Sequence, residues 1–181
     1  MDTALIEVPA ELFNPAESAH YQGSLTLPLM KFGPDTYTFE EDLSWDVDLT
    51  NTGEALLVEG TCEVVGFTAC ARCGELAEVP LFGEIEGYFF LDDEEAHGED
   101  MEGDEFDVLP DDHKLDLLPL IQAAITLDIP VIPLCDDDCK GLCTQCGANL
   151  NEGSCGCQEV KDDINPNNPF AALQGFVVDE G

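Results

Sequence analysis

The chain has 181 residues, of which 40 are acidic and only five are Lys or Arg, so its formal net charge is −35. Phosphate backbones repel such a protein, because affinity for nucleic acid comes chiefly from Lys and Arg that neutralise phosphates. The length suffices for one sizeable core, or for one core with a small appended module. The acidity fits a solvated, salt-adapted surface and a strongly basic partner equally well, and composition alone does not choose between them.

The first residues, MDTALIEVPAELF, lack the basic start and long apolar run of a signal peptide. No stretch approaches the roughly 18 apolar residues that a membrane span requires. We therefore expect a cytoplasmic protein without membrane association. In that compartment thiols stay reduced, and clustered cysteines more often bind metal than form disulfides.

The first half of the chain predicts strands. In residues 42–49 (DLSWDVDL), apolar residues alternate with Asp or Ser, as in a half-buried strand. Residues 14–21 are expected to form a loop, and Gly60 suggests a bulge in a long strand. The predicted strands are 5–8, 23–29, 36–39, 42–49, 54–67 and 77–91. Together they indicate an antiparallel sheet or small barrel of an α+β protein.

Residues 92–112, DDEEAHGEDMEGDEFDVLPDD, are dominated by like charge and predict a flexible, self-repelling linker or insert. We expect His97 and His113 to be exposed titratable residues rather than ligands. A mostly apolar helix follows, with Asp116 as its N-cap and its end before Pro130. This helix is expected to pack on the sheet, and residues 131–134 to form an extended lead-in.

Residues 135–157, CDDDCKGLCTQCGANLNEGSCGC, hold six of the nine cysteines. A Cys-x-x-Cys-Gly sequence such as the one at 143–147 is typical of a zinc knuckle, and a Cys-x-Cys pair shortly afterwards completes four ligands. A disulfide cluster fits less well with a reducing compartment and an odd cysteine count. The first predicted zinc site consists of Cys143, Cys146, Cys155 and Cys157.

A second Cys-x-x-Cys-Gly sequence, at 70–74, lies between two predicted strands, where a hairpin turn would present both sulfurs to one metal. A redox dithiol of the thioredoxin type would instead precede a helix. Because structural zinc takes four ligands, the second predicted site consists of Cys70, Cys73, Cys135 and Cys139. We expect Cys62 to be a small buried apolar residue, and two Zn²⁺ ions per chain.

These predictions divide the chain into consecutive segments. Residues 1–91 form a β-rich domain that carries the Cys70/Cys73 turn, and 92–112 form the acidic linker. Residues 113–134 contain the single helix and the extended lead-in to the cysteines, and 135–160 form the C-terminal zinc knuckle module. A Pro/Asn linker and a short apolar tail occupy 161–181.

The sequence CARC after a strand, the helix LDLLPLIQAAITLDIPVIPLC, the run DDDCKGLCTQCGANLNEGSCGC and the closing NPFAALQGF resemble the YceD-like family. These are the large ribosomal RNA subunit accumulation proteins, and the likeness extends from about Leu57 to Phe176. Thr144 stands where the family pattern leads us to expect Pro, and the acidic-Pro-Arg ending of zinc-bearing members is missing. The resemblance implies a bacterial or plastid factor, without enzymatic activity, that large-subunit ribosomal RNA needs in order to accumulate.

The sequence is compatible with three classes of function. The first is a zinc-stabilised acidic scaffold that binds a basic ribosomal protein or a large-subunit assembly intermediate. The second is a direct RNA-binding zinc protein, which the predominance of Asp and Glu around the cysteines disfavours. The third is an enzyme, such as a thiol redox protein, but closed four-cysteine zinc sites offer no open metal position and no nucleophile–base pattern is present. We expect the first.

Overall fold

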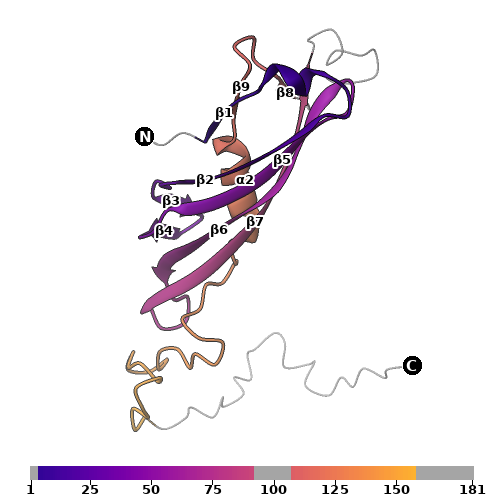
Figure 1. Ribbon diagram of the computed structural model, residues 1–181. Coiled ribbons are helices and arrows are strands. Elements are labelled where there is room, and N and C mark those ends of the chain that lie inside the picture. Colours follow the sequence, from indigo (N-terminus) through magenta and orange to yellow (C-terminus); the bar gives the residue numbers. More distant parts are fainter. Residues whose placement is uncertain (1–3, 92–106, 158–181) are drawn as a thin grey trace, which may run out of the picture. The chain divides into compact units, whose positions relative to one another are not determined.

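The structure, a computed structural model, describes residues 4–91 and 107–157 (Figure 1). Most of the predicted acidic linker, His97 and the predicted tail at 161–181 lie outside the described residues. Chain contacts define two compact units, Met1–Cys139 and Lys140–Gly181. The boundary falls inside the 135–160 segment, so Cys135 and Cys139 belong to the first unit.

The first unit is built on a mostly antiparallel sheet whose centre is a long hairpin. Strand β6 (Ala55–Ala69) pairs with β7 (Leu76–Phe90) over its whole length, from Ala55↔Phe90 to Ala69↔Leu76. The other edge of β6 pairs first with β5 and then, nearer its end, with β4. The remaining strands of this sheet in the described part are β2 (Ser18–Leu25), β3 (Met30–Phe32), β4 (Asp35–Phe39), β5 (Leu43–Asn51) and β8 (Asp107–Val108), in the order β2-β5-β6-β4-β3 with β7 beside β6 and β8 beside β7.

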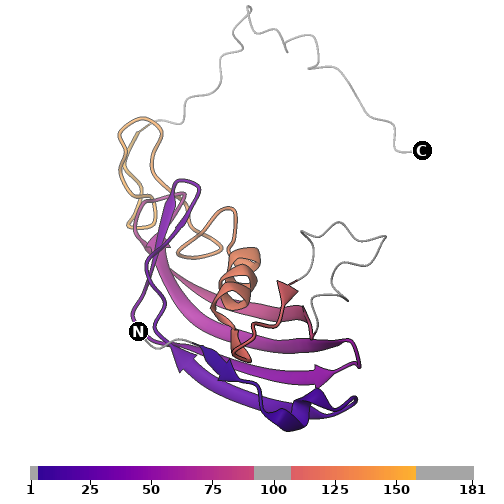
Figure 2. The ribbon, with the colours of Figure 1, turned by 90° about the horizontal axis from the view of Figure 1, so that it is seen from above.

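Four further elements complete the first unit. Strand β1 (Leu5–Glu7) pairs antiparallel with β9 (Lys114–Asp116), and a short 3-10 helix, η1 (Ala10–Phe13), follows β1. The single α-helix of the described part, α2 (Leu118–Asp128), lies across one face of the sheet (Figure 2). A mostly antiparallel sheet with one packed helix is the predicted fold class, which is thereby confirmed.

The two faces of the sheet differ because side chains alternate along each strand. From Leu76 to Glu86, β7 alternates strictly between exposed and buried residues. Its buried residues face α2, together with the inward side chains of β5 and β6. The buried core contributed by sheet and helix includes Leu43, Val47, Leu49, Leu56, Val58, Leu81, Ile85, Ile121 and Ile125. The opposite face of the sheet carries the exposed residues and is not covered by a helix of the described part.

Small residues bring α2 close to the sheet. An added Cβ at Gly83 would lie 2.8 Å from the Cβ of Ala124 and 2.8 Å from the Sγ of Cys62. Four residues further along β7, an added Cβ at Gly87 would lie 2.7 Å from Leu120 Cδ1. Glycine at these positions therefore leaves the space that the helix occupies, and the apolar helix covers the inward residues of the hairpin.

Several local predictions need correction. Strand β2 begins at Ser18, inside the predicted 14–21 loop, and ends before Pro28, because its polar residues pair with β5 rather than forming a turn. Pairing through Gly60 is continuous with both neighbouring strands, so the expected bulge is absent. Gly60 instead allows close approach, since an added Cβ would lie 2.7 Å from the Cα of Val47. The short strands β3, β8 and β9 were not predicted, and β8 lies inside the predicted acidic linker, where Asp107 and Val108 pair with the end of β7.

The contact between Gly83 and α2 gives a test of the packing. Gly83→Ala should lower the free energy of unfolding by about 1–3 kcal/mol, because the new methyl group overpacks the space between Ala124 and Cys62. Chemical denaturation measures this directly. Gly66→Ala is the matched control, since its added Cβ would meet Tyr37 Cδ1 at 3.1 Å and needs a smaller adjustment. Equal losses for the two variants would contradict the packing described for α2.

Candidate metal centres

The turn between β6 and β7 presents two cysteine sulfurs on the same side. The N–H of Gly74 donates to the carbonyl of Cys70 over 2.8 Å, and the N–H of Cys70 donates to the carbonyl of Glu75 over 2.7 Å. Gly74 has φ +76°, a left-handed conformation that glycine adopts without steric cost. The turn is thus closed by its own backbone, which fixes Cys70 and Cys73 as a chelating pair.

The second half of this centre comes from the segment after α2. The N–H of Ala71 donates to the carbonyl of Pro133 over 2.8 Å, which holds the lead-in against the turn. Between the two cysteines of this half, the N–H of Cys139 donates to the carbonyl of Asp136 over 3.0 Å. The Asp136 carboxylate also accepts from the N–H of Asp138 over 2.8 Å, which tightens the loop.

The four sulfurs of Cys70, Cys73, Cys135 and Cys139 lie within 4.8 Å of one another. The sulfur of Cys70 is 3.8 Å from that of Cys139, and that of Cys73 is 3.6 Å from that of Cys135. Four thiolates at about 2.3 Å from one tetrahedral zinc would be separated by roughly 3.8 Å. The sulfurs therefore have the spacing of a Cys₄ zinc centre, and three of these four cysteines are buried.

The second unit contains the other group of four sulfurs within 4.8 Å, from Cys143, Cys146, Cys155 and Cys157. Its first half repeats the hydrogen bonds of the β6–β7 turn. The N–H of Gly147 donates to the carbonyl of Cys143 over 2.8 Å, and the N–H of Cys143 donates to the carbonyl of Ala148 over 2.8 Å. Gly147 has φ +73°, close to the value of Gly74.

Both turns also close on a pair of strand residues at the same positions. Ala69 pairs with Leu76 at the end of the β6–β7 hairpin, and Leu142 pairs with Asn149 in an isolated bridge. In each case the bridge joins the residue before the first cysteine to the residue six after that cysteine. The same chelating hairpin thus occurs twice, once on a long hairpin and once as a miniature.

The described residues of the second unit have almost no apolar interior. In residues 140–157 only Gly141 is buried, and Leu142 is 44% exposed. Backbone hydrogen bonds from Leu150 to Gly141 and from Lys140 to the Asn151 side chain fold the segment over the cysteines. A segment this small usually needs a metal or disulfides to remain folded.

The thiols of each centre influence one another. Burial alone would raise the pKa of Cys70, but surrounding backbone N–H groups outweigh it and lower the pKa to about 6. Backbone N–H groups, including that of Gln145 at 3.4 Å from the sulfur, lower the pKa of Cys143 to about 6. Hydrogen bonding to a neighbouring cysteine raises the pKa of Cys135 and of Cys157 to about 12. Each centre therefore contains one thiol with a lowered pKa and at least one with a raised pKa, and a cation would have to displace the proton of the latter.

The other candidate ligands lie outside these two centres. Cys62 is 3% exposed under α2, as predicted, and burial raises the pKa of its thiol to about 11. His20 hydrogen-bonds Asp48 over 3.0 Å on the sheet. The ring of His113 lies 4.7 Å from that of Phe13.

The two groups of four cysteines are those that their spacing suggested, and zinc as their cation stays a prediction. The charge of Arg72 predicts that it lies beside this centre of four thiolates, but its hydrogen bonds to the loop that carries Cys139 were not predicted. Its guanidinium donates to the carbonyl of Cys139 over 2.9 Å and to that of Asp137 over 3.3 Å. It therefore joins the β6–β7 turn to the loop that supplies the other two sulfurs of the same centre. Its position between Cys70 and Cys73, as one of five basic residues, was the available signal.

With this geometry described, the chain can be compared with known proteins. The family model described as "Large ribosomal RNA subunit accumulation protein YceD" matches residues 58–177, which is more than half of the chain. The chain belongs to the YceD family. The match includes all but the first three residues of the long hairpin, the whole of α2 and all eight cysteines of the two centres.

Three relatives illustrate the range of the family. The Arabidopsis thaliana "Large ribosomal RNA subunit accumulation protein YCED homolog 1, chloroplastic" is 29% identical over 64% of this chain and 44% of its own length. The Zea mays protein of the same name is 30% identical over 62% of this chain and 47% of its own length. An uncharacterized protein of Mycobacterium tuberculosis H37Rv is 29% identical over 78% of this chain and 65% of its own length. The chain thus spans less than two-thirds of each of these relatives.

No solved structure matches the chain. Among the residues that the structure describes, no helix has the length and apolar character needed to cross a bilayer.

The two centres predict two zinc ions per chain. Cys143→Ser should lose one of them, whereas Cys70→Ser and Cys139→Ser should each lose the other. The Cys70→Ser/Cys139→Ser double variant should lose no more than either single variant, because both ligands belong to one centre. Elemental analysis measures the stoichiometry, and Cys62→Ala, outside both centres, should retain two ions. A Cys70→Ser variant that keeps both would contradict the grouping.

Metal removal should affect the two units differently. A chelator should abolish amide-exchange protection in residues 141–157, because little but the metal holds that segment, and should leave the core of β5–β7 protected. Hydrogen exchange with and without the chelator checks both halves of this expectation. Protection that persists in residues 141–157 would show that the second unit is stable without metal.

Proposed function

We propose that this protein is a non-enzymatic factor in large-subunit ribosome assembly that supports the accumulation of large-subunit ribosomal RNA. The observation that carries the proposal is the family match over residues 58–177. The relatives from Arabidopsis and maize carry that activity in their names. In our proposal the protein acts in the cytoplasm as an acidic scaffold, stabilised by two zinc ions, that binds a basic ribosomal or assembly protein.

The donor sets support a structural rather than a catalytic use of zinc. Four thiolates complete a tetrahedral shell, whereas a catalytic zinc needs a position for water or substrate. The first cysteine pair lies in the turn between β6 and β7, not at the start of a helix as in thioredoxin-like proteins. Zinc here would fix loops, and the sheet would then supply the surface that a partner meets.

The charge supports a protein partner over RNA. A net charge of −35 creates a long-range field that accelerates encounters with basic proteins and opposes encounters with phosphate backbones. Direct RNA binding through the second unit is the alternative, but the sequence of residues 140–181 has six Asp or Glu residues against two Lys residues. An acidic companion could hold a basic ribosomal protein until that protein meets its RNA.

Loss of the protein tests the cellular role. Depletion from the host cell should lower the ratio of large- to small-subunit ribosomal RNA, and sucrose-gradient profiles should show fewer large subunits. Re-expression of the intact chain should restore the ratio. An unchanged ratio after complete depletion would overturn the role in accumulation.

Binding in vitro tests the class of partner. Affinity for a purified basic large-subunit protein should fall steeply between 0.1 M and 1 M salt, because the Debye length shrinks from about 10 Å to about 3 Å. Naked large-subunit RNA at physiological salt should show no measurable binding. Fluorescence anisotropy measures both affinities. Tight binding of RNA without binding of the basic protein would contradict the protein partner and favour direct RNA binding.

A further inference from the structure

The face of the sheet opposite α2 concentrates carboxylates from adjacent strands. Asp48, Glu59 and Glu86 lie directly across from one another on β5, β6 and β7. All three are exposed. Like charges directly opposite in a sheet are destabilising, so these side chains repel one another in the free protein. A cationic partner on this face would relieve the repulsion.

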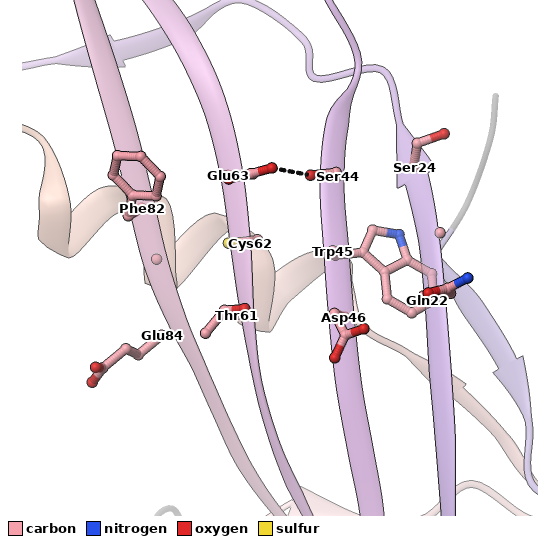
Figure 3. A pocket seen from close by; sticks show the side chains of 12 residues that line it. Gln22, Ser24, Ser44, Trp45, Asp46, Thr61, Cys62, Glu63, Phe82 and Glu84 are labelled. Atoms are coloured by element: carbon pink, nitrogen blue, oxygen red, sulfur yellow. Dashed lines mark hydrogen bonds between the residues drawn. The ribbon is translucent and has the colours of Figure 1, made fainter.

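Beside this row the face is hollowed. A hollow of about 830 Å³ has small side chains such as Ser44 and Thr61 across its middle and Asp46, Glu63 and Glu84 around them. Phe82, which is 64% exposed, stands at one side of the hollow (Figure 3). A second hollow of about 340 Å³ shares part of this lining and adds two further carboxylates. We call the combined surface the acidic trough, defined by Glu41, Asp42, Asp46, Glu63, Phe82 and Glu84.

The carboxylates of the acidic trough have little compensation from the described residues. No Lys or Arg of residues 4–91 and 107–157 lines either hollow. His20 contacts the edge of the surface, with its Nε2 3.1 Å from an Asp46 oxygen. Glu63 accepts a neutral hydrogen bond from the Ser44 hydroxyl over 3.2 Å. Negative charge, open volume and an exposed aromatic ring thus coincide at one place.

We propose that the acidic trough is the docking site for a Lys/Arg-rich segment of a protein partner. This inference rests on the proposed function and identifies the surface through which the basic partner is held. Guanidinium and ammonium groups can bond the carboxylates, and an Arg side chain can stack on the ring of Phe82. Acidic residues alone would not identify a docking site, because a chain with a net charge of −35 has many of them. The hollow and the exposed ring distinguish this one.

The test uses the intact zinc-loaded chain and a dye-labelled dodecapeptide that alternates arginine and glycine. Asp46→Asn/Glu63→Gln/Glu84→Gln should weaken binding about five- to tenfold at 0.1 M salt, because it removes three solvent-exposed ion pairs. The charge-matched control, Glu7→Gln/Glu17→Gln/Asp111→Asn, changes net charge equally away from the acidic trough. Its loss should be about twofold or less, since only the long-range field changes.

The aromatic contact has its own pair of variants. Phe82→Ser should weaken binding of the peptide about two- to fivefold, as expected for loss of an exposed cation–π contact. Leu76→Ser is the control, because Leu76 is 69% exposed on the same strand but lines neither hollow. Amide chemical-shift changes on titration should concentrate on residues 44–46, 61–63 and 82–84. Equal losses for variants and controls, or shifts spread evenly over acidic surfaces, would overturn the proposal.

Two further outcomes separate this proposal from the proposed function. A purified basic ribosomal protein that binds the triple variant and its control equally well would overturn the acidic trough and leave the cellular role intact. A uridine oligonucleotide that binds the intact chain, and is lost with the triple variant, would show that the trough serves RNA and would overturn the protein partner. Normal ribosomal RNA levels after depletion would overturn the cellular role alone.

Discussion

The antiparallel pairing of β6 with β7 is the interaction on which the first unit depends. It runs from Ala55↔Phe90 to Ala69↔Leu76, and each part of the molecule's chemistry lies at a defined place on it. One face buries inward residues under α2, where Gly83 and Gly87 leave room for the helix. The other face aligns carboxylates across strands. The turn at the end of the hairpin carries Cys70 and Cys73. A shift in register would therefore move the core residues, the carboxylates and the sulfurs together.

The two metal centres contain the same hydrogen-bonded Cys-x-x-Cys-Gly turn in different surroundings. At the end of the long hairpin, the turn is supported by a sheet with a large apolar core, and Arg72 ties it to the loop that supplies the other two sulfurs. In residues 140–157 the same hydrogen bonds close a turn that has almost no buried side chains. A cation would therefore organise a loop in the first case and an entire segment in the second. Both fit a role in shaping surfaces rather than in catalysis.

The sequence was most informative where a short pattern determines local geometry. The Cys-x-x-Cys-Gly spacing predicted both chelating turns, and the alternation of apolar and polar residues predicted β5. Prediction was poorer where tertiary contacts decide. Ser18–Leu25 is polar and gives no clear pattern, yet it forms a strand because β5 offers a paired edge. Gly60 suggested a bulge, but β5 approaches it closely and the register continues. The acidic trough was also not predicted, since it requires the cross-strand register to bring Asp46, Glu63 and Glu84 together.

The central claim is that both centres are closed, structural zinc sites in a protein that acts as a scaffold. X-ray absorption at the zinc edge of the purified chain measures this most directly, because it reports the identity and distance of the first-shell atoms. The account predicts four sulfur neighbours per zinc at about 2.3 Å and no nitrogen or oxygen ligand. A first shell that contains oxygen or nitrogen in either centre would contradict it, since an open or mixed coordination position is what a catalytic zinc requires.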